Sequence, residues 1–177
     1  AEVARTFRSE LDRFVSREIA SREGELKSRL RSRPGDVKAR NSLGVLYARY
    51  GRYEAAEEQF RSAVARRSDY VPALVNLGNL AYLREEYAAA RRSYRRVLEA
   101  APDNRAALLG IARVEYAAED YDAAEDVYGR LSRVSPDLAE RFSYLAAGAA
   151  GSSAGATGRA GGGASGFDTL VVWEDEL

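Results

Sequence analysis

The feature of this sequence that most constrains its fold is a period of 34 residues that runs through the middle of the chain. A shift by one period superimposes Tyr53, Tyr87 and Tyr121, and other positions align in the same register without an insertion. A repeat of this length indicates a stack of supersecondary units, each of which buries its apolar face against the next. The further aligned sets are Ala55, Ala89 and Ala123; Ala56, Ala90 and Ala124; Phe60, Tyr94 and Tyr128; Leu43, Leu77 and Ile111; Gly44, Gly78 and Ala112; and Asp69, Asp103 and Asp137.

Each period predicts two helices. From Val37 an apolar stripe with helical spacing runs to about Tyr50 and Gly51, and a second helix is expected from Tyr53 to about Arg67. At the expected crossing of the two helices, the first helix carries Gly or Ala and the facing side of the second helix carries Ala. Two helix axes approach to about 8 Å only where the contact residues are small. The aromatic set at 60, 94 and 128 is then expected to fill the gap between neighbouring units.

Acidic residues and prolines recur at the boundaries between units. Asp103 and Asp137 come just before helical patterns, so we expect their carboxylates to cap exposed backbone N–H groups. The adjacent Pro102 and Pro136 are expected to close the preceding helices, because proline donates no backbone hydrogen bond.

The aligned residues resemble the tetratricopeptide repeat family, which has the same repeat length. Its Leu-Gly pair matches Leu43-Gly44 and Leu77-Gly78, its Ala and aromatic match the sets above, and its final Pro matches Pro102 and Pro136. The departures are Ser68 for the first Pro, Ala112 for the third Gly, and Arg40, Leu74 and Leu108 for the early Trp.

The resemblance spans Val37 to Leu138 and implies an all-α fold. It implies a right-handed α-solenoid of three helical hairpins, at 37–70, 71–104 and 105–138, with N- and C-terminal capping helices and a flexible C-terminal tail. The expected domain plan is an N-terminal helix or degenerate repeat at 1–33, the repeats at 34–135, a cap helix at 136–147, a Gly/Ala/Ser linker at 148–166 and an acidic-aromatic tail at 167–177.

The two flanks leave alternatives open. In 1–33, one helical face is followed by Leu26 and Leu30, and Leu26 falls where the repeats have Phe60, so this segment is either a cap or a coiled-coil or dimerisation helix. The first face is made of Phe7, Leu11, Phe14, Val15 and Ile19. At the other end we expect a closing helix from Asp137 to about Ala147, with Leu138, Phe142 and Leu145 facing inward.

The tail is either a linear recognition motif or a frayed terminus. It holds the only Trp of the chain and ends in three consecutive acidic residues before Leu177. A 19-residue linker of this composition has a root-mean-square reach of roughly 24 Å, which allows the tail to dock on its own repeats. The candidate ligand residues are Phe167, Leu170, Val172, Trp173 and Glu174.

The family resemblance places ligand contacts on the first helices, which line the concave face. Among them, Asn76 and Asn79 lie one turn apart on an otherwise apolar helix, and an Asn amide can hold an extended backbone through both its donor and its acceptor. The groove residues that we expect are Asn41, Val45, Arg49, Val75, Asn76, Asn79, Tyr82, Leu83, Leu109, Arg113 and Tyr116.

Two other patterns are given a more conservative interpretation. Some family members clamp a C-terminal carboxylate with Lys and Asn at set positions; here only Asn76 fits, so that function is not expected. The second-helix cations Arg91, Arg92, Arg95 and Arg96 are expected to form a solvated face paired with Glu85, Glu86 or Glu99, with a secondary docking patch as the alternative.

The composition narrows the function further. With no Cys and no His, the chain cannot form disulfides, imidazole or thiolate zinc sites, or Ser-His-Asp triads, and we expect no metal and no cofactor. Basic and acidic residues balance at 27 each, and residues 34–135 carry 16 basic and 15 acidic side chains, so nucleic acid is a poor partner. No apolar run approaches the ~20 residues of a membrane span, and the start lacks a signal-peptide pattern, so we expect a soluble chain, cytoplasmic or periplasmic.

The expected function is therefore not enzymatic. The sequence favours a protein–protein or peptide interaction scaffold that binds an extended peptide in its concave groove, with its own tail as a ligand in cis or in trans. The alternative is a structural spacer or self-association module within a larger assembly.

Overall fold

The computed structural model describes the backbone of residues 2–146 and 173–175, and the side chains of these residues except 2–12 and 15. This part of the chain contains helices and turns and no strand. It divides into two compact units, residues 1–68 with 175–177 and residues 69–174.

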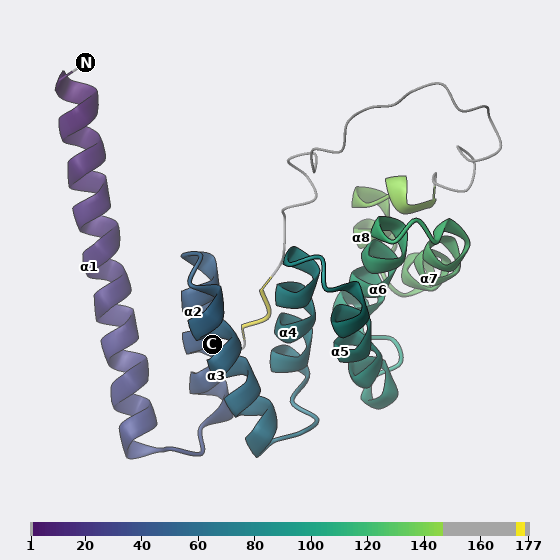
Figure 1. Cartoon of the computed structure of the whole chain (residues 1–177), viewed down its shortest axis with the longest axis horizontal. Helices are drawn as coiled ribbons and strands as arrows, with labels where there is room; N and C mark the ends of the chain where they lie inside the picture. Colours follow the sequence, from purple (N-terminus) through teal and green to yellow (C-terminus); the bar gives the residue numbers. More distant parts are fainter. Residues whose placement is uncertain (1, 147–172, 176–177) are drawn as a thin grey trace. The chain divides into compact units, whose positions relative to one another are not determined.

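The first unit holds α1 (Glu2–Ser32), α2 (Val37–Arg49) and α3 (Tyr53–Arg66), and α1 is one uninterrupted helix (Figure 1). At the start of α2, the Asp36 carboxylate accepts a hydrogen bond from the Ala39 N–H at 2.9 Å. It also accepts one from Arg29 of α1 at 2.7 Å, which ties the two helices together at this end. Leu26 of α1 is buried, as Phe60 of α3 is.

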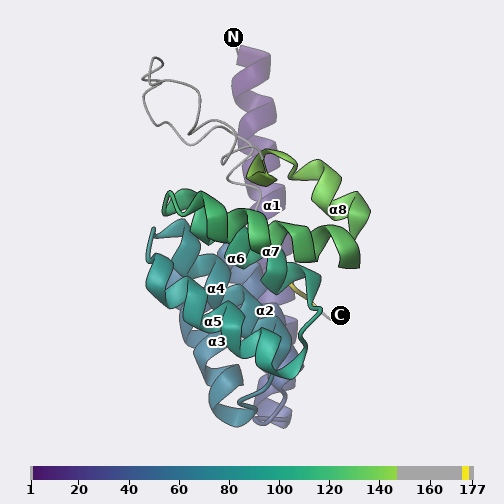
Figure 2. The ribbon, with the colours of Figure 1, turned by 90° about the vertical axis from the view of Figure 1, so that its right-hand side faces the viewer.

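The second unit holds α4 (Val71–Leu83), α5 (Tyr87–Ala100), α6 (Arg105–Ala117), α7 (Tyr121–Val134) and α8 (Pro136–Arg141), with the hairpin α6/α7 followed by α8 (Figure 2). α5 packs against both α4 and α6. Tyr94 of α5 lies at the centre of this packing, because a Cβ added to Gly78 of α4 would lie 2.5 Å from the Tyr94 ring, and a Cβ added to Gly110 of α6 would come as close to the same ring. The expectation that this aromatic fills the gap between neighbouring hairpins is therefore confirmed for Tyr94.

The helix bounds keep the period of the sequence. The hairpins begin at Val37, Val71 and Arg105, and their second helices begin at Tyr53, Tyr87 and Tyr121. In each hairpin the connecting turn has one residue in the left-handed region, with φ values of 71° at Gly51, 60° at Glu85 and 62° at Glu119.

Neither predicted capping residue caps its helix, because the N-cap positions lie one residue after Asp103 and two residues before Asp137. Asn104, and not Asp103, caps α6, because its backbone is extended and its side chain accepts from the Ala107 N–H at 2.9 Å. Pro136 is the first residue of α8, so Asp137 lies inside the first turn of that helix. Proline suits this position because the first N–H groups of a helix have no partner within the helix.

The closing helix is also shorter than predicted. α8 ends at Arg141, a turn follows at Phe142 and Ser143, and residues 144–146 form one more helical turn. The break keeps Phe142 and Leu145 buried in a cluster with residues of α6 and α7, as the sequence predicted, whereas Leu138 is half-buried.

Arg91 has a different partner from the expected one. It forms a bidentate pair with Glu115 of α6, one bond of which measures 2.6 Å from Nε to Oε1, instead of pairing with Glu85, Glu86 or Glu99. Helical spacing predicts pairs along one helix, but this pair joins consecutive hairpins, and Glu115 is only 4% exposed.

Glu23 and Tyr47 occupy the positions two 34-residue periods before Arg91 and Glu115. The Tyr47 hydroxyl donates to the Glu23 carboxylate at 2.8 Å. The hydrogen bonds to Lys27 and to Tyr47 hold the pKa of Glu23 below its usual value. The C-terminal half of α1 thus packs on α2 in the register that α5 keeps on α6.

Candidate functional site

The side chain of Asn76 on α4 holds the backbone of Glu174. The Glu174 N–H donates to Asn76 Oδ1 at 2.9 Å, and Asn76 Nδ2 donates to the Glu174 carbonyl oxygen at 2.9 Å. Both groups belong to the second unit. Because both bonds go to the main chain of the tail, this contact recognises an extended backbone and places no demand on the side chain at that position.

The surroundings of Asn76 fix its orientation. α4 begins after Tyr70 with Pro72 in its first turn, and nearly every other side chain of the helix is apolar. Asn76 is fully buried once Glu174 is in place. A buried amide stabilises a fold only when its hydrogen-bonding groups have partners, so the paired tail backbone and the position of Asn76 support each other.

Asn79, one turn further along α4, has an internal role. The Tyr94 hydroxyl donates to Asn79 Oδ1 at 2.7 Å inside the hairpin α4/α5. Burial raises the pKa of Tyr94, while the charge of Arg113 acts in the opposite direction. Asn79 therefore links the two helices of its hairpin at the edge of a pocket that opens next to it.

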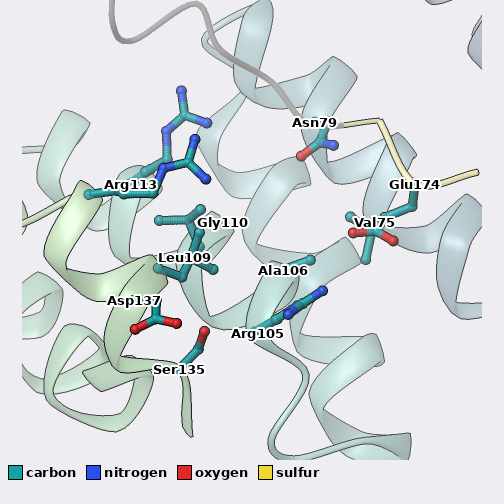
Figure 3. Close-up of a pocket in the computed structure, with 12 residues that line it drawn as sticks. Val75, Asn79, Arg105, Ala106, Leu109, Gly110, Arg113, Ser135, Asp137 and Glu174 are labelled. Atoms are coloured by element: carbon teal, nitrogen blue, oxygen red, sulfur yellow. The ribbon is translucent and has the colours of Figure 1, made fainter. Parts of the chain in front are cut away.

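This pocket lies in the second unit between α4, α6, α8 and Glu174, and its volume is about 330 Å³ (Figure 3). Glu174 and Val75 lie on one side of it, and Arg113 and Asp137 lie on the opposite side. The lining residues are Val75, Asn79, Arg105, Ala106, Leu109, Gly110, Arg113, Ser135, Asp137, Leu138, Arg141 and Glu174.

Arg113 is the buried cation of this pocket. Its side chain is 6% exposed, and its guanidinium carbon lies 4.5 Å from the centre of the Tyr82 ring and 6.0 Å from that of Phe142. An arginine face against an aromatic ring is a favourable cation–π arrangement, and it restricts the conformations of the long side chain.

In the first unit, a second tail residue contacts a first helix. Ser42 of α2 is buried, and its hydroxyl donates to Asp175 Oδ1 at 2.6 Å. Asn41 and Val45 on the same helix are buried, whereas Arg49 is exposed.

The structure brings together only part of the predicted groove. Val75, Asn79, Leu109 and Arg113 line one pocket, Asn76 holds the tail, and Tyr82, Leu83 and Tyr116 are half-buried. Of the predicted tail ligand residues, Trp173 is half-buried and Glu174 is bound, and Phe167, Leu170 and Val172 lie outside the described residues.

Several pocket residues were missed by sequence reasoning. They are Arg105, Ser135, Asp137, Leu138 and Arg141. Three of these, Asp137, Leu138 and Arg141, come from the C-terminal cap, which the sequence presented only as a cover for the last repeat. Arg105 and Arg141 line the same pocket as Arg113, and a comparison of charged positions along the sequence is the signal that could have pointed to them.

Among the side chains that the structure describes, no group of three carboxylates is arranged to hold a metal ion. In the same part of the chain, no helix is both long enough and apolar enough to cross a membrane.

The fold defines a class: helical hairpins of equal length that recur with one period, as in α-solenoids. Two family models, both described as tetratricopeptide repeat, match residues 25–71 and 81–148. The chain belongs to the tetratricopeptide repeat family, and the predicted all-α solenoid fold is confirmed.

Solved structures of the same fold include three informative neighbours. A tetratricopeptide repeat protein from Parabacteroides merdae ATCC 43184 is 20% identical with a TM-score of 0.67, over 80% of this chain and 57% of that one. MamA is 19% identical with a TM-score of 0.63, over 79% of this chain and 87% of its own. YrrB, described as a TPR protein with an unusual peptide-binding site, is 17% identical with a TM-score of 0.63, over 78% and 72%. Among curated proteins, none matches this sequence.

Proposed function

We propose that this chain is a non-enzymatic interaction module that holds an extended peptide segment along α4. The tetratricopeptide family supports the general class, a scaffold for contacts between proteins. The observation that carries the specific proposal is the pair of hydrogen bonds between the Asn76 amide and the backbone of Glu174. A peptide-binding site described for YrrB, a protein of the same fold, agrees with this function.

The segment 167–177 is the proposed resident ligand, in cis or in trans. It is joined to the repeats by a Gly/Ala/Ser linker, and attachment through such a linker raises the local concentration of a segment into the mM range. A partner peptide that uses the same backbone clamp must compete with this segment, so the tail sets a threshold for partner binding.

A second candidate function is self-association through α1. Phe14 on this helix is 65% exposed, and the neighbouring described residues 13 and 16–18 are exposed as well. In the sequence, Phe14 belongs to an apolar helical face with Phe7 and Leu11, and a contiguous apolar face favours packing against another helix. Concentration-dependent oligomers that persist after Asn76→Ala and vanish after Phe14→Ser would support this alternative.

Trp173 offers a direct test of the peptide clamp, because it is the only Trp of the chain. In the full-length protein, Asn76→Ala removes both hydrogen bonds to Glu174, and each such bond contributes about 0.5–1.5 kcal/mol. We expect Trp173 emission to shift to the red and acrylamide quenching to increase, with far-UV circular dichroism unchanged.

The matched control is Arg92→Ala, on an exposed position of α5 in the same unit. A labelled peptide of residues 167–177, added in trans and followed by anisotropy, should bind the wild type and the control more tightly than Asn76→Ala, by roughly five- to a hundredfold. Equal emission and equal peptide affinity in all three proteins would remove the clamp.

A further inference from the structure

We infer that α1 pairs with α1 of a second copy of this chain, in antiparallel orientation, through the helical face of residues 4–18. This inference rests on the second candidate function, self-association through α1, and names its partner and its geometry. Two observations carry it: Phe14 is exposed on a half of α1 that the first repeat leaves uncovered, and the charges beside Phe14 match those of an antiparallel copy. The other half of α1 serves as the cap, so both alternatives that the sequence leaves open for 1–33 apply to this one helix.

The C-terminal half of α1 is the part that packs on the first repeat. Leu26 is buried, and Glu23 accepts the hydrogen bond of Tyr47, which lies in the last turn of α2. Arg52, in the turn that follows α2, lies 3.6 Å from the Glu23 carboxylate. The end of α2 is therefore level with Glu23, and the N-terminal half of α1 continues past it (Figure 1).

The face of α1 that carries Phe14 differs from the face that packs on α2. Successive residues of an α-helix are rotated by about 100°, so Phe14 lies about 120° around the helix from Leu26 and about 180° from Glu23. Phe14 is 65% exposed, and the described residues 13 and 16–18 around it are exposed as well. Because most of the stability of a helix in a protein comes from the packing of one face, this half of α1 gains stability from a partner helix.

The sequence of this half follows a heptad pattern, abcdefg. Phe7, Leu11 and Phe14 are spaced by four and three residues and occupy successive d, a and d positions. The same heptad places Ala4 and Glu18 at the outer a positions. Apolar residues at a and d form the narrow seam of a two-helix coiled coil, and a second copy carries the identical seam, as a two-fold dimer requires.

Charges beside the seam disfavour a parallel pair. Arg17 and Arg22 occupy a g position and the following e position, which face each other when the helices are parallel. Arg22 also forms an ion pair with Glu25 of its own helix at 3.1 Å, which weakens this repulsion. A parallel pair brings Glu18 against Glu18 of the second copy as well, because a positions face each other in that orientation. Both contacts join like charges, which oppose association.

An antiparallel pair brings opposite charges together beside the same seam. With Leu11 packed against Phe14 of the second copy, Glu10 and Arg17 occupy facing g positions, and the two-fold axis makes this contact twice. Arg17 is exposed, and its own helix offers it no carboxylate at a spacing of three or four residues. A second antiparallel copy supplies that carboxylate, and such flanking pairs fix the orientation and register of the helices.

Sedimentation equilibrium of the full-length protein measures the dissociation constant of the dimer. The antiparallel pair predicts that Arg17→Glu weakens the dimer about five- to tenfold, because two acidic pairs then flank the seam. Glu10→Arg should weaken it to the same degree, and the double variant should return to within about twofold of the wild type. Arg13→Glu is the matched control, an equal charge reversal at an exposed position of α1 outside the seam, and it should leave the dissociation constant unchanged.

Disulfide formation reports the orientation directly, since the chain has no Cys of its own. An equimolar mixture of the Glu10→Cys and Arg17→Cys proteins is incubated in a glutathione redox buffer. In the antiparallel pair these two positions face each other, whereas two copies of either position are separated along the helix axis. The mixed disulfide should therefore form faster than either symmetric one.

The outcomes separate this inference from the functions on which it builds. A dimer that Arg17→Glu strengthens would show parallel pairing, which overturns the inference and leaves self-association through α1 standing. Equal weakening by Arg13→Glu and Arg17→Glu would assign the effect to overall charge and overturn the inference as well. A dimer that survives Phe14→Ser, or a protein that stays monomeric at about 1 mM, would remove both the antiparallel pair and self-association through α1. The peptide clamp is judged separately, by Trp173 emission in Asn76→Ala.

Discussion

The turns inside the second and third hairpins contain a residue type that their backbone disfavours. Glu85 and Glu119 have φ values of 60° and 62°, and the first hairpin has Gly51 at the equivalent position with φ 71°. The turns share one hydrogen bond, made by the residue that follows the left-handed one. The Glu86 N–H donates to the Ala81 carbonyl at 2.8 Å, and the Arg52 N–H donates to the Tyr47 carbonyl at 2.9 Å. This 6→1 bond closes the helix in the pattern that usually places Gly at the preceding residue.

The substitutions Glu85→Gly and Glu119→Gly should therefore stabilise the protein. A left-handed conformation costs a residue with a Cβ about 1–2 kcal/mol, and replacement by Gly removes this cost. Gly also has more conformational freedom in the unfolded chain, which destabilises the folded state by about 0.4–1 kcal/mol. The expected net gain is about 0.5–1 kcal/mol at each site. In a chain of this length, that corresponds to an increase in melting temperature of about 1–4 °C.

Urea denaturation followed by circular dichroism at 222 nm measures the effect. Glu85→Gln is the matched control, because it removes the charge and retains the backbone strain, so its midpoint should stay within error of wild type. The reverse substitution, Gly51→Glu, should lower the stability of the first hairpin. Stabilisation by Glu85→Gln equal to that by Glu85→Gly would show that charge, and not conformation, is the cause, and would refute the reasoning.

Three further predictions concern packing and pH. Asn79→Ala should destabilise by about 1–3 kcal/mol, since it deprives the buried Tyr94 hydroxyl of its acceptor, and adding Tyr94→Phe should recover part of that loss in a double-mutant cycle by urea denaturation. Gly78→Ala should cost about 1–3 kcal/mol in the same assay, because the new methyl group meets the Tyr94 ring. Lys27 lowers the folded-state pKa of Glu23. Glu23 therefore contributes stability that is present above its unfolded-state pKa and is lost as the pH falls through its folded-state pKa. Glu23→Gln should make the urea midpoint depend less on pH between pH 6 and pH 3.

The sequence determined the helices better than it determined their side-chain partners. The period placed Val37, Tyr53 and their equivalents at the helix starts, because one register must satisfy the same small-residue contacts in every hairpin. It misplaced the cap of α6 by one residue, since Asp103 and Asn104 are both good capping residues and only the backbone conformation decides between them.

The site was harder to predict than the fold for a geometric reason. Asn76 and Asn79 follow the same sequence pattern, yet Asn76 bonds to the tail backbone and Asn79 bonds to Tyr94. Side chains three residues apart on a helix point in directions that differ by about 60°. The bond between Arg91 and Glu115 joins two hairpins, and the pocket beside Asn79 needs α8 in place beside α6. Neither contact follows from spacing along one helix.

Hydrogen exchange at the Glu174 amide, read by nuclear magnetic resonance, tests the central claim most directly, since that N–H is the donor to Asn76. The clamp predicts that this amide exchanges at least about tenfold more slowly than in the isolated peptide, and that Asn76→Ala removes the protection while protection within α4 persists. Exchange at the free-peptide rate in the wild type, or equal protection in Asn76→Ala, would contradict it.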